Sequence, residues 1–228
     1  MALSNKRILE EMEKGHIIID PFNPKNLNTS SYDVTLGRYF YRRQKLPWNQ
    51  PFDNIWNEEH NKLVWGEPEQ AQNAKTLFAE MGPHHAGISP NDEVIMLSPG
   101  EVILAHTIEY IGGRNHITTM MHSRSSMGRS QIGVCDDAGW GDVGFFNRWT
   151  MEIRHKVKET EGGKPIPLVI GRRIAQIIFF ETGPVLETDA DYAKGGKYQE
   201  SSEIEVLKRD WHPAMMLPRL YKDRDINK

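Results

Sequence analysis

The stretch Trp149-Thr150-Met151-Glu152-Ile153 decides the fold class of this chain. Strict alternation places Trp149, Met151 and Ile153 on one face of a strand and leaves Thr150 and Glu152 on the other face. A carboxylate within an apolar strand costs free energy unless it has a partner or solvent. Two interpretations stay open: Glu152 faces a cleft, where burial raises its pKa, or it faces solvent as an ordinary polar strand residue.

Short apolar runs of this kind recur along the chain, separated by glycine and proline. Short apolar runs separated by turn residues are typical of an all-β sandwich or barrel. Only one convincing helix is predicted, over residues 5–14, with Ser4 as its N-cap and Gly15 as its stop. Gly112-Gly113 is among the predicted turns. Strands are predicted at 17–19, 31–37, 94–97, 101–105, 117–121, 131–134, 149–153, 166–170 and 174–180.

The length of 228 residues suits one β-rich core, so we predict a single domain over 1–228. A polar insertion is predicted within it at 43–90, with short elements of its own. This insertion contains Trp48, Trp56 and Trp65. It is either a surface segment held down by its tryptophans or a lid over a substrate.

Residues 184–228 are predicted to form a polar C-terminal extension or lid. Within it, the run Lys194-Gly195-Gly196-Lys197-Tyr198 is typical of a segment that closes over a ligand.

Composition excludes several classes of function. The net charge of -3, from 28 basic and 31 acidic residues, provides no basic face for duplex nucleic acid. The single cysteine, Cys135, excludes an internal disulfide and a His/Cys/Cys zinc site, and we expect it to be buried. The histidines show no metal-ligand spacing. No window is apolar enough to span a membrane, and we expect a cytoplasmic protein.

Two groups of polar residues could bind a ligand. Arg124, Ser125, Ser126 and Arg129 combine forked cationic donors with hydroxyls, which suit phosphate oxygens. They form either a polyphosphate clamp or a turn with two surface arginines. Asp142, between glycines, either orients water, a ribose hydroxyl or a metal, or is an Asx-type turn residue.

Several motifs in this chain resemble the dCTP deaminases of the dUTPase-like superfamily. Outside the insertion they keep the order found in that family over most of the chain. The motifs are Ile19-Asp20-Pro21, the runs 31–37, 99–105 and 107–110, Arg124-Ser125-Ser126-Met127-Gly128-Arg129, the run 138–145, Thr150-Met151-Glu152-Ile153 and Gly196-Lys197-Tyr198-Gln199.

The resemblance implies a fold, an assembly and a ligand. The fold is a mainly β, dUTPase-like distorted barrel or jelly-roll with a short N-terminal helix. It is assembled as a homotrimer with active sites at subunit interfaces. The ligand is a deoxynucleotide triphosphate, dCTP with dUTP or dTTP as further candidates. Mg²⁺ accompanies the triphosphate without direct protein ligands, and no zinc is implied.

The resemblance also assigns roles by position. Glu152 matches the catalytic glutamate, and Asp142 matches the carboxylate that orients sugar and water. The remaining nucleotide-binding positions are Arg124, Ser125, Ser126 and Arg129 for the triphosphate, Lys197 and Tyr198 in the segment that folds over it, and Asp137, Trp140, Thr150 and Tyr192.

The implied reaction is zinc-independent hydrolytic deamination of dCTP to dUTP and ammonia, in which Glu152 takes a proton from water attacking C4 and delivers protons towards N3 and the leaving amine. Two alternatives remain. One is a dUTPase or a bifunctional enzyme that gives dUMP and pyrophosphate. The other is a noncatalytic nucleotide-binding or partner-binding protein on the same scaffold. Asp137 and Val143 depart from the residues common in the family, so the identity of the base is left open.

Overall fold

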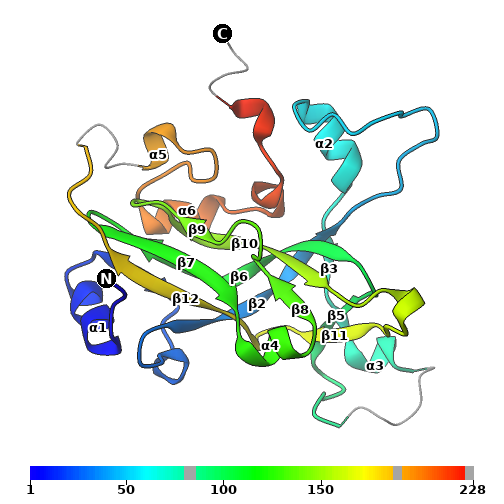
Figure 1. The fold of residues 1–228 in the computed structure, drawn as a ribbon, viewed down its shortest axis with the longest axis horizontal. Helices are drawn as coiled ribbons and strands as arrows, with labels where there is room; N and C mark the ends of the chain where they lie inside the picture. The colour runs from blue at the N-terminus through cyan, green and yellow to red at the C-terminus, as the bar shows by residue number, and fades with distance from the viewer. Residues whose placement is uncertain (80–85, 187–191, 224–228) are drawn as a thin grey trace.

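A computed structural model describes residues 1–79, 86–186 and 192–223. Residues 80–85 of the predicted insertion and 187–191 and 224–228 of the predicted C-terminal extension lie outside this description. Figure 1 shows a curled antiparallel sheet whose edges carry short helices. Among the described residues, no helix combines the length and apolar character needed to cross a bilayer.

The predicted strands are all present, several of them longer than expected. Three further strands are too short for a periodic pattern to reveal them. The strands are β1 (Ile17–Asp20), β2 (Tyr32–Arg42), β3 (Glu69–Gln70), β4 (Gln72–Asn73), β5 (Glu93–Leu97), β6 (Val102–Gly113), β7 (Ile117–Ser123), β8 (Ile132–Val134), β9 (Trp140–Gly141), β10 (Phe146–His155), β11 (Ile166–Val169) and β12 (Arg173–Glu181).

The main sheet has nine strands, in the order β8-β10-β6-β2-β12-β7-β9, with β1 added beside β6 and β3 beside β2. The sheet curls until β8 approaches β7, where the backbone N–H of Val134 donates to Ser123 Oγ at 2.7 Å. A smaller sheet contains β11, β5 and β4. This mainly β, partly closed barrel agrees with the predicted fold class.

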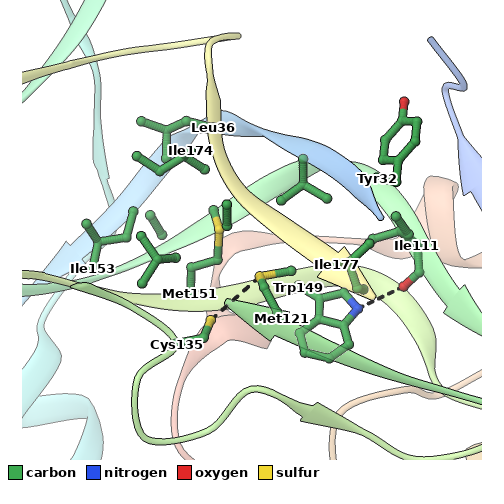
Figure 2. Close-up of a cluster of buried hydrophobic side chains, with 14 of the residues drawn as sticks. Tyr32, Leu36, Ile111, Met121, Cys135, Trp149, Met151, Ile153, Ile174 and Ile177 are labelled. Carbon is green, nitrogen blue, oxygen red and sulfur yellow. Dashed lines mark hydrogen bonds between the residues drawn. The ribbon is translucent and has the colours of Figure 1, made fainter. Parts of the chain in front are cut away.

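The core lies inside the curl, as Figure 2 shows. Trp149, Met151 and Ile153 are buried there, which confirms the alternation predicted for this strand. The indole N–H of Trp149 donates to the carbonyl oxygen of Ile111 at 2.8 Å. Cys135 is also buried, with its sulfur 3.7 Å from that of Met121, as predicted for a small apolar residue.

The predicted turn at Gly112-Gly113 is wrong, because both glycines lie inside β6. Gly112 pairs with Phe146 of β10 and Gly113 pairs with Ile17 of β1. A Cβ atom on Gly112 would collide with the carbonyl oxygen of Phe145. These glycines therefore permit a close approach of neighbouring strands instead of a reversal of the chain.

The prediction of a single convincing helix is also wrong. Helix α1 (Asn5–Glu13) forms as expected, with Ser4 Oγ accepting from the backbone N–H of Arg7 at 3.4 Å and Gly15 at φ 72°. The additional helices are too short to be stable from local sequence and depend on tertiary packing. They are α2 (Glu58–Trp65), α3 (Ala74–Leu77), α4 (Ser125–Arg129), α5 (Tyr192–Gly195) and α6 (Ile204–Asp210), with 3₁₀ turns at Pro24–Asn26, Glu159–Glu161, Pro213–Met216 and Leu220–Lys222.

The tryptophans of the predicted insertion do not hold it down as a group. Trp48 is 97% exposed and Trp56 is 54% exposed. Only Trp65 packs against a buried cluster, which contains Tyr41 and Leu104. The segment does contain short elements of its own, α2, β3, β4 and α3.

A charged cluster fastens α1 to the sheet. Glu11 Oε2 lies 2.7 Å from His16 Nδ1 and 3.4 Å from His116 Nε2, so distant histidines gather around one buried carboxylate. Spacing along the chain does not reveal this group. Glu11 Oε1 pairs with Arg7 at 3.1 Å and Lys14 at 2.9 Å. Since these cations already neutralise the carboxylate, we interpret the cluster as an ion-pair network.

Candidate active site

The polar face of β10 lines a cavity of ≈ 310 Å³. Thr150 and Glu152 both contribute to it, which favours the cleft over the solvent-exposed interpretation of that face. Asp142, Trp140, Tyr192 and Tyr198 lie on its wall, so six of the residues predicted for the site come together here. The other lining residues are Leu104, Ala138, Gly141, Phe145, Asn147, Arg148, Trp149, Trp211, Met215, Met216 and Pro218.

The surroundings of Glu152 favour the protonated form of its carboxyl. Its Oε2 atom is buried and has no hydrogen-bond partner among the described residues. Burial raises the pKa of Glu152, and the charge of Asp137 raises it further, although a backbone hydrogen bond and the Cys135 thiol oppose the shift. The group is therefore shifted towards the range in which it can both take and give a proton.

Asp142 lies at the rim, in the turn between β9 and β10. The backbone N–H of Phe145 donates to the carbonyl oxygen of Asp142 at 3.1 Å, leaving the carboxylate exposed. Tyr192 of α5 packs edge-on against Phe145, with ring centroids 5.3 Å apart. Burial raises the pKa of Tyr192, and so does the nearby charge of Asp142. Asp142 and Tyr192 also line a neighbouring cavity, together with Trp140 and Lys197.

The chain after α5 is fastened onto β10. The amide of Asn147 donates to the carbonyl oxygen of Tyr198 at 3.1 Å. The buried Gln199 accepts from the backbone N–H of Phe146 at 2.7 Å and donates to the carbonyl oxygen of Gly144 at 2.9 Å. Lys197 pairs with Asp223 at 3.3 Å. The run predicted to close over a ligand thus lies against the cavity in this structure.

The predicted phosphate clamp lies apart from this cavity. Ser125, Ser126 and Arg129 are exposed on α4, which follows the end of β7. Arg124 Nε pairs with the buried carboxylate of Asp33 at 3.0 Å. None of the four lines either cavity described above. Figure 1 shows α4 beyond the end of β7, beside β8.

Asp137 also lies outside the cavity lining. Its side chain is exposed and pairs with Arg154 of β10 at 3.3 Å. The structure therefore places it beside Glu152 as a source of negative charge, without bringing it into the cavity.

Sequence reasoning missed two groups of cavity residues. Arg148 lies four residues before Glu152 on the same strand, and its spacing from that glutamate was a usable signal. Trp211, Met215 and Met216 come from a segment distant along the chain, whose contact with β6 and β10 no local pattern indicates.

The curled antiparallel sheet, with an acid-bearing cavity on its outer face, defines a mainly β protein whose candidate active site lies outside the core. More narrowly, residues 2–182 match the family model described as dCTP deaminase-like, and the chain belongs to this family.

Relatives and a solved structure agree with this assignment. A Nanoarchaeum equitans (strain Kin4-M) protein named "dCTP deaminase, dUMP-forming" is 29% identical over 212 residues, 90% of this chain and 98% of the relative. A Streptomyces griseus subsp. griseus protein of the same name is 30% identical over 201 residues, 88% of each chain. The crystal structure of 2'-deoxycytidine 5'-triphosphate deaminase from Agrobacterium tumefaciens shares the fold, with a TM-score of 0.53 at 16% identity. That alignment covers 86% of this chain but 53% of the other.

Proposed function

We propose that this protein deaminates dCTP hydrolytically, giving dUTP and ammonia. The observation that carries the proposal is Glu152, whose buried, unpartnered Oε2 faces a cavity and whose pKa burial raises. A carboxyl in this state suits a reaction that first removes a proton from water and then returns protons to the product. The names of the relatives support dCTP as the substrate.

In the proposed mechanism, Glu152 takes a proton from the water that attacks C4 of cytosine. The C4–O bond forms as Glu152 passes that proton to the ring nitrogen N3. Glu152 then moves the proton of the new C4 hydroxyl to the amine, and the C4–N bond breaks to release ammonia and form the C4 carbonyl. Asp142, at the rim of the same cavity, orients the sugar and water. Thr150 lies on the same face of β10 as Glu152 and contributes a hydroxyl to the nucleotide site.

Phosphate binding is proposed for Arg124, Ser125, Ser126 and Arg129, with Lys197 and Tyr198 covering the phosphates. The cationic side chains and the hydroxyls donate hydrogen bonds to phosphate oxygens. Mg²⁺ prefers oxygen ligands, and the phosphates carry such oxygens. We therefore infer that the triphosphate itself supplies the ligands of the metal. Bound there, Mg²⁺ neutralises part of the phosphate charge.

We also infer that a complete site needs more than one copy of the chain. The proposed clamp on α4 and the proposed acid on β10 do not share a cavity within one chain. A homotrimer in which the clamp of one subunit reaches the cavity of another brings both parts to one nucleotide. Within each subunit, residues 1–228 form one domain with an insertion at 43–90 and a C-terminal extension at 184–228.

A second candidate function is a bifunctional enzyme that continues from dUTP to dUMP and pyrophosphate. The name of both relatives, "dCTP deaminase, dUMP-forming", favours it. The exposed carboxylate of Asp142 could orient the second water, which attacks a phosphate.

One assay separates these functions. Purified protein is incubated with dCTP and Mg²⁺, and ammonia and pyrophosphate are measured separately. Ammonia alone identifies a deaminase, and ammonia with an equal amount of pyrophosphate identifies the bifunctional enzyme. Pyrophosphate from dUTP, with no ammonia from dCTP, contradicts deamination. Release of neither product favours a noncatalytic binding protein.

A further inference from the structure

Two buried, unpartnered polar atoms belong to residues that line the same cavity. Among the described residues, three buried side-chain nitrogen or oxygen atoms have no hydrogen-bond partner. Arg148 Nε and Glu152 Oε2 are two of them, and both residues belong to β10 and line the cavity. An N–H can only donate, and a carboxylate oxygen accepts. Because a buried polar group without a partner is costly, this donor and acceptor point to a ligand that offers both complements.

The guanidinium of Arg148 is held in place by aromatic rings. Its central carbon lies 4.8 Å from the Trp211 ring centroid and 5.1 Å from that of Tyr110. The Tyr110 hydroxyl also interacts with it, and Glu109 contributes negative charge nearby. No carboxylate in the described part of the chain is within ion-pair distance of Arg148. The side chain is thus fixed without its charge being consumed by a salt bridge.

His106 does not supply the missing acceptor. Its Nδ1 lies 2.8 Å from the carbonyl oxygen of Thr107, and its Nε2 lies 3.3 Å from the backbone nitrogen of Tyr39. A carbonyl only accepts and a backbone N–H only donates, so this network assigns the proton to Nδ1. Burial lowers the pKa of His106 to about 4, which keeps the ring neutral at pH 7. Nδ1 is therefore a donor itself, although it lies 3.5 Å from Arg148 Nη1.

We propose that Arg148 is a substrate-binding residue that donates from Nε to an acceptor on the pyrimidine ring, while Trp211 positions its guanidinium. The proposal rests on the proposed function and names a contact for its substrate. Cytosine offers the required pair of complements, because its amine donates and its N3 and 2-carbonyl oxygen accept. The amine faces Glu152, and a ring acceptor faces Arg148.

The test measures equilibrium binding by calorimetry, which needs no turnover, with three ligands: dCTP, dUTP and 2-deoxyribose 5-triphosphate, which lacks a base. Arg148→Gln is expected to weaken dCTP binding by roughly 10- to 100-fold, as the loss of one hydrogen bond to a charged group does. Binding of the base-free triphosphate stays unchanged. Arg148→Lys keeps the charge but has no donor at the Nε position, so it should weaken dCTP binding as well. This second variant decides the question if Arg148→Gln does not fold.

A comparison of the two pyrimidines locates the acceptor. Equal losses for dCTP and dUTP identify the 2-carbonyl oxygen, which both bases carry. A larger loss for dCTP identifies N3, which is protonated in uracil. Arg172→Gln is the matched control, because Arg172 lies outside both cavities and pairs with Asp92 at 3.2 Å. It should leave all three affinities unchanged.

Two results overturn the contact. If Arg148→Gln binds dCTP as tightly as the wild type, the Nε atom is satisfied by water alone. If it weakens dCTP and the base-free triphosphate equally, Arg148 shapes the site without touching the base. Ammonia release tests deamination separately. A wild type that binds dCTP without releasing ammonia refutes the proposed reaction. The affinities of the Arg148 variants for the three ligands still decide the Arg148 contact in that case. A wild type that binds neither pyrimidine nucleotide refutes both.

Discussion

The backbone N–H of Cys135 donates to the carbonyl oxygen of Glu152 at 3.1 Å, just beyond the paired part of β8. Cys135 adopts a positive φ of 51° there, and its sulfur points into the core. Burial raises the pKa of this thiol, and the charge of Glu152 raises it further, so the thiol stays protonated at neutral pH. The relationship fixes the backbone of Glu152 while leaving Oε2 of its carboxyl to the cavity.

Substitution of Glu152 by glutamine separates proton transfer from binding. We expect Glu152→Gln to lower kcat for ammonia release by at least about 100-fold, the usual contribution of a general acid-base group. Calorimetry should show that dCTP binding survives. Full activity in this variant would remove Glu152 from the mechanism.

Glu152→Gln should raise thermal stability although it lowers activity. The folded-state pKa of Glu152 is raised, so the ionised carboxylate is disfavoured in the native protein at pH 7. Glu152→Gln is expected to raise Tm at pH 7. The advantage should shrink as the pH falls towards the ordinary glutamate pKa of 4.5 and vanish below it, where the wild-type carboxyl is protonated in both states. Equal Tm values at pH 7 would contradict the burial of this charge.

Hybrid oligomers test whether the clamp and the acid come from different subunits. Arg129→Ala and Glu152→Gln should each inactivate the homo-oligomer, the first by weakening triphosphate binding roughly 10-fold or more. Co-expression of differently tagged copies, followed by purification on both tags, should restore part of the ammonia release, because some sites receive both native residues. No recovery in verified hybrids would place the clamp and the acid within one subunit. Wild-type copies carrying the two tags are the control.

Gln199 is expected to control how well the C-terminal segment closes the cavity. Gln199→Leu leaves the backbone N–H of Phe146 and the carbonyl oxygen of Gly144 without their partners. Each loss costs about 1–3 kcal/mol if the group stays buried, so the segment should detach locally. Amide hydrogen exchange at Phe146 should accelerate and KM for dCTP should rise. Exposed Gln50→Leu is the control and should alter neither measurement.

The Glu11 network predicts acid lability of the N-terminal helix. Burial alone would raise the pKa of Glu11, but hydrogen bonds from Lys14 and His16 with the charge of Arg7 lower it to about 2. A lowered folded-state pKa gives stability that is complete above pH 4.5 and is lost as pH falls towards 2. Glu11→Gln should lower the free energy of unfolding at pH 7 by about 2 kcal/mol, with a shallower acid dependence. Denaturant titrations between pH 2 and 7 measure both slopes, and parallel slopes would contradict the prediction.

Sequence patterns predicted this molecule best where a residue's neighbours along the chain decide its surroundings. Alternation around Met151 separated the core face of β10 from the cavity face, since a strand imposes that geometry by itself. The same reasoning failed at Gly112, where the deciding neighbour is a carbonyl on another strand. It also missed Trp211, Met215 and Met216, because the segment that carries them is distant along the chain from β10 and no local pattern links the two. For the α4 clamp, the residues were predicted together with those of β10, but the fold separates them.

One wall of the cavity is synthesised after the last strand of the curled sheet. The segment that matches the family ends at residue 182, yet Trp211 and Met216 line the same cavity as Glu152. Met216 also belongs to a buried cluster with Tyr41 and Leu104. The ribosome therefore completes every strand of the curled sheet before it adds Trp211 and Met216, which line the cavity with Glu152.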